Sequence, residues 1–247
     1  MKVIGKDLNS KQTKDKINKL KTSEKFKNVI TELQKYATFQ LDLSDIITAI
    51  HYDIGYKEDV VTGETIELKL GDNVTVSHTE RYVNADKGAK RDFVIGTIIT
   101  PNDQQEVDIM NIRANESGYV SIKENKSIAI PDDVTSLGKL DDDFYDKDYY
   151  PEKLLETANK ASAFDGCLSG GYIWCGGNCG GSAACKSTKN GINALDNCCK
   201  AHDCCYSNFG IKKPFHCICD QRLCDCAQKT PWSGWKYFVQ AYFCFVC

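Results

Sequence analysis

The chain has 247 residues, of which 42% are hydrophobic and 26% are charged, and its formal net charge is −3. This balance is typical of globular proteins, so a wholly disordered chain, a collagen-like chain and a polytopic membrane protein are excluded. The sequence contains no run of about 18 apolar residues, which excludes a membrane-spanning helix. The length suits one or two domains.

All 14 cysteines lie between Cys167 and Cys247. Their density indicates a disulfide scaffold made in an oxidising compartment, or a metal-binding module. The same segment carries seven lysines and one arginine against four aspartates, a net charge of +4, so residues 1–166 carry −7. A basic segment suits an anionic partner such as phospholipid headgroups or nucleic acid. No signal peptide is recognised, because no apolar segment follows the basic start of the chain.

The N-terminal region is expected to contain helix first and then a β module. Residues 1–21 are rich in Lys, Asn and Gln and are expected to fray, whereas apolar residues at helical spacing predict a helix over 23–37. A short second helix is expected to end near Ile50. Five β-branched runs separated by turn residues then predict an antiparallel module of about 70 residues. These runs are 64–70, 75–83, 92–100, 106–112 and 119–122.

Two cysteine-rich segments, 195–206 and 216–226, are predicted to form an antiparallel helix hairpin, because the connection between them is short. Facing residues in such a hairpin have sequence numbers with a constant sum. This register places Cys205 opposite Cys219 and Cys198 opposite Cys226, which predicts a ladder of two disulfides. It also makes Cys217 a candidate partner for Cys204.

The same register brings His202 level with Asp220. A histidine held by a carboxylate is a general base with a fixed tautomer. Asp203 points about 100° away around the helix and remains as a ligand for a hard cation. The Gly-rich loop 170–181 offers backbone carbonyls as further ligands, and Cys175 is placed to tie this loop to the His-bearing helix.

These segments resemble the secreted phospholipase A2 family. The family's active-site helix signature is matched by CCKAHDCCY at 198–206, its second helix by CICD at 217–220, and the start of its calcium loop by WCG at 174–176. The resemblance is confined to about 167–226. It implies a calcium-dependent phospholipase A2, a carboxylic ester hydrolase that cleaves the sn-2 acyl ester of glycerophospholipids.

The resemblance also implies residue roles. His202 would take a proton from the attacking water, Asp220 would orient His202, and Tyr206 would hydrogen-bond to Asp220. The family's disulfides would be Cys175–Cys199, Cys198–Cys226 and Cys205–Cys219, of which the last two agree with the hairpin register. Partners are left open for Cys167, Cys179, Cys185, Cys224, Cys244 and Cys247.

A calcium site is the third implication. Asp203 would bind Ca²⁺ together with backbone carbonyls of the loop, and the N–H of Gly176 would help to stabilise the oxyanion. The carbonyls would belong to Trp174, Gly176 and either Gly177 or Asn178. Asn178 stands where the family usually has glycine, and asparagine tolerates the left-handed conformation.

Two other functions are weighed. A catalytically silent phospholipase-like toxin, or a membrane- or receptor-binding protein, would use the same scaffold without hydrolysis. A zinc module is disfavoured, because adjacent cysteine pairs do not match the spacing of tetrahedral sites. The aromatic tail 232–247 is expected to pack as core or lid, or else to bind the membrane interface. The predicted partner is an anionic phospholipid surface and not nucleic acid.

The predicted fold class is α+β. An N-terminal helix plus a small antiparallel β module over 1–130 would act as a pro-segment or accessory module. An acidic linker would follow over 131–160, with a helix from about Pro151 to Ala163. A disulfide-rich, α-helical phospholipase A2-like domain would occupy 161–247. The protein is expected to be secreted or otherwise extracytoplasmic, by an export route left open.

Overall fold

The computed structural model describes residues 1–102, 105–115, 117–131, 137–140, 142–158, 164–180, 183–210 and 216–244. Within these residues, seven strands form one antiparallel sheet in which each strand pairs with its neighbours in sequence. They are β1 (Lys2–Asp7), β2 (Ile46–Tyr56), β3 (Asp59–Gly71), β4 (Val74–Val83), β5 (Arg91–Pro101), β6 (Glu106–Ala114) and β7 (Val120–Ala129). Strands β8 (Gly166–Cys167) and β9 (Gly176–Gly177) form a separate short pair.

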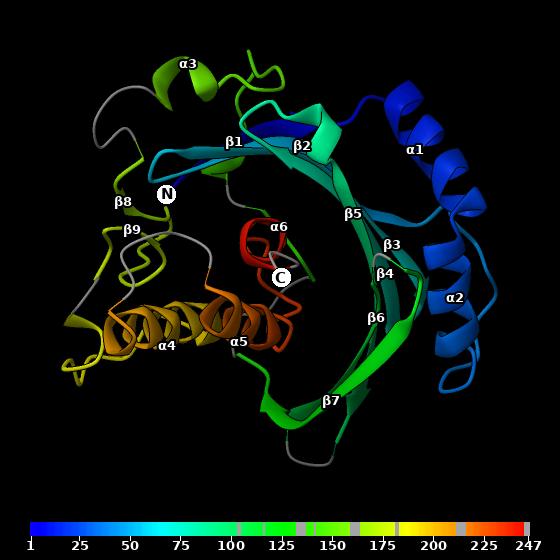
Figure 1. Ribbon diagram of the computed structural model, residues 1–247. Helices are drawn as coiled ribbons and strands as arrows, with labels where there is room; N and C mark the ends of the chain where they lie inside the picture. Colours follow the sequence, from blue (N-terminus) through cyan, green and yellow to red (C-terminus); the bar gives the residue numbers. More distant parts are fainter. Residues whose placement is uncertain are drawn as a thin grey trace.

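The sheet is strongly curved, and helices cover both of its faces (Figure 1). Helices α1 and α2 lie on the outer side, called here the convex face, whereas α4, α5 and α6 lie inside the curve, on the concave face. The helices are α1 (Ser10–Thr22), α2 (Glu24–Leu33), α3 (Leu155–Ala158), α4 (Ala194–Asn208), α5 (Cys217–Ala227) and α6 (Lys236–Phe243), with short 3-10 turns η1 (Lys87–Ala89) and η2 (Asp142–Phe144).

The expectation that residues 1–21 fray is wrong, because they form β1 and α1. A capping box between Asn9 and Gln12 starts α1. Lys16 on this helix is buried, and its ammonium lies 3.2 Å from Glu64 and 3.0 Å from Glu80 on the sheet. Lysines of this segment therefore form ion pairs with acidic residues of the convex face.

The prediction for the segment before Tyr56 also needs correction. The predicted helix over 23–37 is found as α2, which ends at Leu33, four residues earlier than predicted, and the short helix expected to end near Ile50 is wrong, since these residues begin the strand β2. Ile50, Tyr52 and Ile54 alternate along β2 and are buried on the concave face. The five predicted β-branched runs fall in the strands β3 to β7, apart from Tyr119, which directly precedes β7.

The two faces of the sheet are packed differently. Apolar residues of the convex face pack on Leu20 of α1 and on the buried side of α2. The concave core instead combines strand residues such as Tyr52 with α4, α5 and α6. Phe238 of α6 lies at its centre, with its ring 5.1 Å from Tyr52 and 5.2 Å from Phe144.

The predicted fold class is therefore wrong. The molecule has a seven-stranded, β-rich core and not a small β module beside a helical phospholipase A2 domain. The physical reason is that the apolar sides of α4 to α6 need a cover, and the concave face of the sheet provides it. Among the described residues, no helix has the length and apolar character required to cross a bilayer.

The tail and the predicted linker both pack against this core. The core alternative is confirmed for the described part of the tail, since Trp235, Phe238 and Phe243 are all buried. Phe144 and Tyr149, within the predicted linker, are buried as well. The predicted helix from Pro151 to Ala163 is found only as α3, and its last residues, 159–163, lie outside the described part, as do 245–247 and parts of the linker.

Disulfides join most of the cysteines. The three expected pairs Cys175–Cys199, Cys198–Cys226 and Cys205–Cys219 are confirmed. Cys204 pairs with Cys185 and not with Cys217, so that candidate pair is wrong. The remaining described pairs are Cys167–Cys179 and Cys224–Cys244, while Cys247 lies outside the described residues. This content of disulfides indicates an extracellular or otherwise oxidising environment.

Candidate active site

The helix hairpin formed by α4 and α5 carries the predicted catalytic residues. Asn193 caps α4 by accepting a hydrogen bond from the N–H of Asp196, and the side chain of His216 caps α5. Two disulfides, Cys198–Cys226 and Cys205–Cys219, cross between the helices and hold their register. His202 and Asp220 therefore meet between the two rungs.

His202, Asp220 and Tyr206 form one hydrogen-bonded group. Nε2 of His202 lies 2.8 Å from Oδ1 of Asp220, and the hydroxyl of Tyr206 donates to the same oxygen at 2.8 Å. An ionised carboxylate can only accept, so this contact keeps a proton on Nε2 and leaves Nδ1 of His202 as the basic nitrogen. The predicted register is thus confirmed at the level of individual atoms.

Burial strengthens the hydrogen bonds within this group. Asp220 is fully buried, and His202 is only 6% exposed. Burial and the hydrogen bond to Asp220 together raise the pKa of Tyr206 above its usual range, so its hydroxyl stays protonated as a donor. The backbone N–H of His216 donates to the Tyr206 oxygen at 2.9 Å, which fixes the phenol in place.

Asp203 lies on the other side of the imidazole. Its Oδ1 is 3.9 Å from Nδ1 of His202, and its side chain is 15% exposed. Asp196, Cys199 and Asp203 follow one another at helical spacing, so they share one side of α4. That side faces the Gly-rich loop.

Asp196 holds the loop to α4, a role that the sequence analysis missed. Its fully buried carboxylate accepts hydrogen bonds from the backbone N–H groups of Trp174 at 2.9 Å and Cys175 at 3.0 Å. The disulfide Cys175–Cys199 adds a covalent link one turn further along the helix. An aspartate in the first turn of the helix is the only local sign of this role. The loop start is thus fastened one to two turns before Asp203.

The predicted backbone ligands adopt the conformations that the loop requires. Gly176 has a φ of 144°, and a Cβ there would lie 2.1 Å from the carbonyl oxygen of Gly166, so only glycine fits. Leu168 donates to the carbonyl of Cys175 at 2.8 Å, and hydrogen-bonded pairs alternate along antiparallel strands. The N–H and C=O of Gly176 therefore point away from β8.

Asn178 and Trp174 complete the described loop. Asn178 is left-handed, with a φ of 56°, and its side chain donates to Asp165 at 2.8 Å. This agrees with the expectation that asparagine tolerates the position of the family's glycine. Trp174 is 5% exposed and lies under the ammonium of Lys200, 5.3 Å from the ring centroid. Contacts with residues outside the loop thus help to place both residues.

Residues from outside the hairpin close over His202, and the sequence analysis did not place them there. The ring of Phe243 on α6 lies 4.8 Å from that of His202, and Tyr56 on β2 lies 5.5 Å from Phe243. A Cβ on Gly177 would be 3.8 Å from Tyr56, so this tyrosine lies beside the loop. Burial and the negative charges of Asp203 and Asp220 raise the pKa of Tyr56. No local sequence signal marks Tyr56, because strand pairing alone brings it here.

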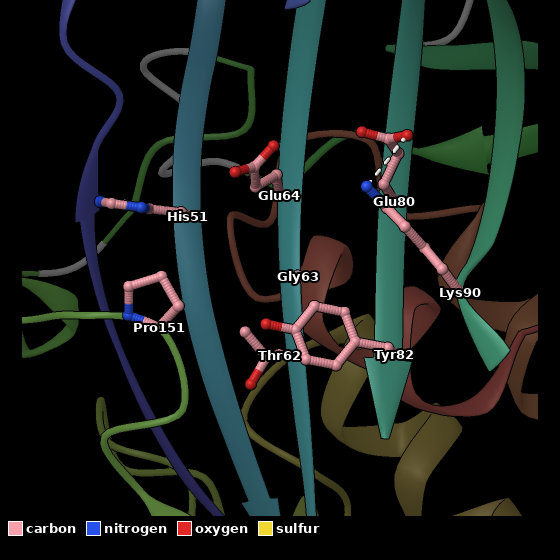
Figure 2. A pocket seen from close by; sticks show the side chains of 8 residues that line it. All are labelled: His51, Thr62, Gly63, Glu64, Glu80, Tyr82, Lys90 and Pro151. Carbon is pink, nitrogen blue, oxygen red and sulfur yellow. Dashed lines mark ion pairs between the residues drawn. The ribbon is translucent and has the colours of Figure 1, made fainter. Parts of the chain in front are cut away.

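A different cavity lies on the convex face (Figure 2). Its volume is about 60 Å³, enough for a few water molecules. Figure 2 shows Glu64 and Glu80 on neighbouring strands, with Glu80 paired to Lys90. Both carboxylates also bind Lys16. Since its charges are already paired, the hairpin remains the better candidate site.

A calcium site fits the donors present. Within the described residues, no group of three or more His, Cys, Asp and Glu side chains converges on one point. A cation at Asp203 would therefore take its other ligands from backbone carbonyls, which suit Ca²⁺. Gly176 and Asn178, two of the candidate carbonyl donors, have φ values of 144° and 56°, and the carbonyl of Gly176 accepts a hydrogen bond from the N–H of Cys179 at 3.3 Å.

Comparisons of the chain with protein-family models, with curated proteins and with solved structures found no match. The short motifs and the geometry of the site are therefore the basis for assigning a function.

Proposed function

We propose that the protein is a calcium-dependent phospholipase A2. The observation that carries this proposal is the buried group His202–Asp220–Tyr206, with Asp203 beside the free nitrogen of the imidazole. A histidine oriented by a carboxylate is suited to activate water. The resemblance of segments 174–176, 198–206 and 217–220 to the secreted phospholipase A2 family supports the same reaction.

In this mechanism Nδ1 of His202 removes a proton from water while the water oxygen attacks the carbonyl carbon of the sn-2 ester. Asp220 stabilises the imidazolium that forms, because its carboxylate stays hydrogen-bonded to Nε2. The proton then passes to the glycerol oxygen as the ester bond breaks, which yields a fatty acid and a lysophospholipid. The N–H of Gly176 donates to the oxyanion.

Asp203 would hold Ca²⁺ together with the carbonyls of Trp174, Gly176 and either Gly177 or Asn178. When bound there, Ca²⁺ supplies a Lewis acid for the ester carbonyl. Asp196 and the disulfide Cys175–Cys199 keep the loop against α4 and so preserve this ligand set. The remaining work of the site is proton transfer by His202.

The proposed substrate surface is anionic phospholipid outside the cytoplasm. The segment 167–247 carries a net charge of +4, which attracts anionic lipid. The disulfides require an oxidising compartment, and secretion is the form of export that we propose.

The test is hydrolysis of mixed-chain phosphatidylglycerol and phosphatidylcholine, with release of the sn-2 fatty acid measured in calcium or in EDTA. We expect activity in calcium only, and its loss in His202→Gln. The matched control is His78→Gln, because His78 is buried in the sheet away from the hairpin.

Two outcomes would overturn the proposal. Hydrolysis that persists in EDTA or in His202→Gln would refute the mechanism. Binding to phosphatidylglycerol vesicles without any fatty acid release would favour the catalytically silent alternative.

A further inference from the structure

The turn between β2 and β3 reaches the active site from the N-terminal sheet. Figure 1 shows this turn beside the short strands β8 and β9. Tyr56, the last residue of β2, lies beside the loop at Gly177 and packs on Phe243, which covers His202. The residue after Tyr56 is Lys57, the first residue of the turn. A segment with no cysteine and no resemblance to phospholipases thus contributes to the site.

Lys57 carries a positive charge to this place. Its ammonium lies 5.9 Å from the ring centroid of Tyr206 and 5.5 Å from that of Tyr56. The Tyr206 ring lies in turn 4.6 Å from the ring of His202. The two distances to the Tyr206 ring set an upper limit on the distance between the Lys57 ammonium and the ring of His202. One phospholipid molecule is long enough to bridge that distance, with its phosphate hydrogen-bonded to Lys57 and its sn-2 ester hydrogen-bonded at the site of His202.

Lys57 differs from the other lysines that lie over aromatic rings. Lys87 pairs with Glu152 at 2.9 Å, Lys153 pairs with Asp146 at 2.8 Å, and Lys236 lies 3.3 Å from Glu67. Lys200 donates to a backbone carbonyl at 2.7 Å. Within the described part of the chain, no oxygen lies at hydrogen-bond or ion-pair distance from the Lys57 ammonium.

The backbone holds Lys57 in an unusual conformation. Tyr56 pairs with Asp59, so the turn has two residues, and Lys57 has a φ of 55°. Glycine is preferred at such a position, because a side chain costs about 1 kcal/mol or more there. The conformation directs a half-buried cation toward Tyr206. Strain of this kind is often kept where function needs the side chain.

We propose that Lys57 binds the phosphate of the phospholipid substrate. This inference rests on the proposed function, since it assigns a specificity-determining residue to the same site. An ammonium between two rings is partly desolvated, so its attraction to a phosphate is stronger than in water. The site would thus select esters that carry a phosphate at the neighbouring glycerol position.

The first test compares two substrates with equal acyl chains: short-chain phosphatidylcholine as a monomer, and the matching diacylglycerol, which lacks the phosphate. We expect Lys57→Gln to lower kcat/KM for phosphatidylcholine by about tenfold or more, through KM, because a hydrogen bond to a charged group is lost. Activity on diacylglycerol should not change, and Lys57→Arg should keep most of the activity. The matched control is Lys87→Gln, which removes another lysine that lies over a tyrosine ring, in the turn η1 between β4 and β5.

The second test measures binding without turnover. Calorimetric titration of His202→Gln with monomeric phosphatidylcholine should give binding that is weakened by about tenfold or more in the double variant His202→Gln, Lys57→Gln. Titration with inorganic phosphate separates a free phosphate site from a lipid headgroup site: phosphate binding equal to lipid binding would overturn the assignment to the substrate. Equal losses on both substrates, or no loss relative to Lys87→Gln, would also overturn it. If the wild type binds phosphatidylcholine through Lys57 but releases no fatty acid, only the proposed reaction is refuted.

Discussion

Phe238 is the residue whose removal should best test whether the sheet and the helix hairpin unfold as one unit. It is fully buried and contacts Tyr52 of the sheet, Phe144 before α3 and Trp235 before α6. Phe238→Ala leaves a cavity shared by all three. A buried Phe→Ala change costs about 3–5 kcal/mol in the free energy of unfolding. For a chain of this size, that loss lowers Tm by roughly 10 °C.

The assay is denaturant unfolding followed by two probes, with the disulfides intact. Far-ultraviolet circular dichroism reports on the helices and strands of the whole chain, and tryptophan fluorescence reports on the C-terminal part, since Trp174, Trp232 and Trp235 are the only tryptophans. We expect both transitions to coincide and to shift together in Phe238→Ala. The control Tyr119→Ala removes a ring that is 70% exposed and should change stability by about 0.5 kcal/mol or less. Two separate transitions, or a shift confined to fluorescence, would refute a shared core.

Two further predictions concern charge. Asp220→Asn should lower kcat by about 100-fold, because two hydrogen bonds to a charged group become bonds to a neutral one. A steady-state assay measures this loss. An equal loss in the exposed control Asp72→Asn would contradict the prediction. Burial opposes the ionisation of Glu80, but Lys16 and Lys19 outweigh it and lower its pKa to about 2. The stability from this depressed pKa is complete above pH 4.5, the ordinary value, and is lost as pH falls toward 2. Urea unfolding between these values should show a smaller decline in Glu80→Gln, and an unchanged decline would exclude the pair as its source.

The pairing of His202 with Asp220 could be predicted because it depends on local periodicity. Cysteines seven residues apart on each helix, joined across a short connection, leave one register for the hairpin. The left-handed Asn178 could be expected for a similar reason, since the conformational range of asparagine is a local property.

The sheet's part in the site could not be predicted in this way. Tyr56 and Lys57 reach the hairpin only because β2 pairs with both β1 and β3, and no local pattern encodes that long-range arrangement. The lysine-rich residues 1–21 concealed β1 and α1, because the acidic partners of Lys16 lie far away in sequence. The fold class was mispredicted for the same reason: hydrophobic periodicity locates strands but does not show which helices cover them.

The disulfide ladder has a consequence for the cell that makes this protein. In a reducing compartment the cysteines of Cys198–Cys226 and Cys205–Cys219 would be free thiols, and no covalent bond would hold His202 level with Asp220. A newly made chain would then lack an assembled proton relay while it remains among the cell's own membranes. Oxidation in the compartment where the disulfides form would complete the relay, so the same bonds that stabilise the fold would also determine where the site is assembled.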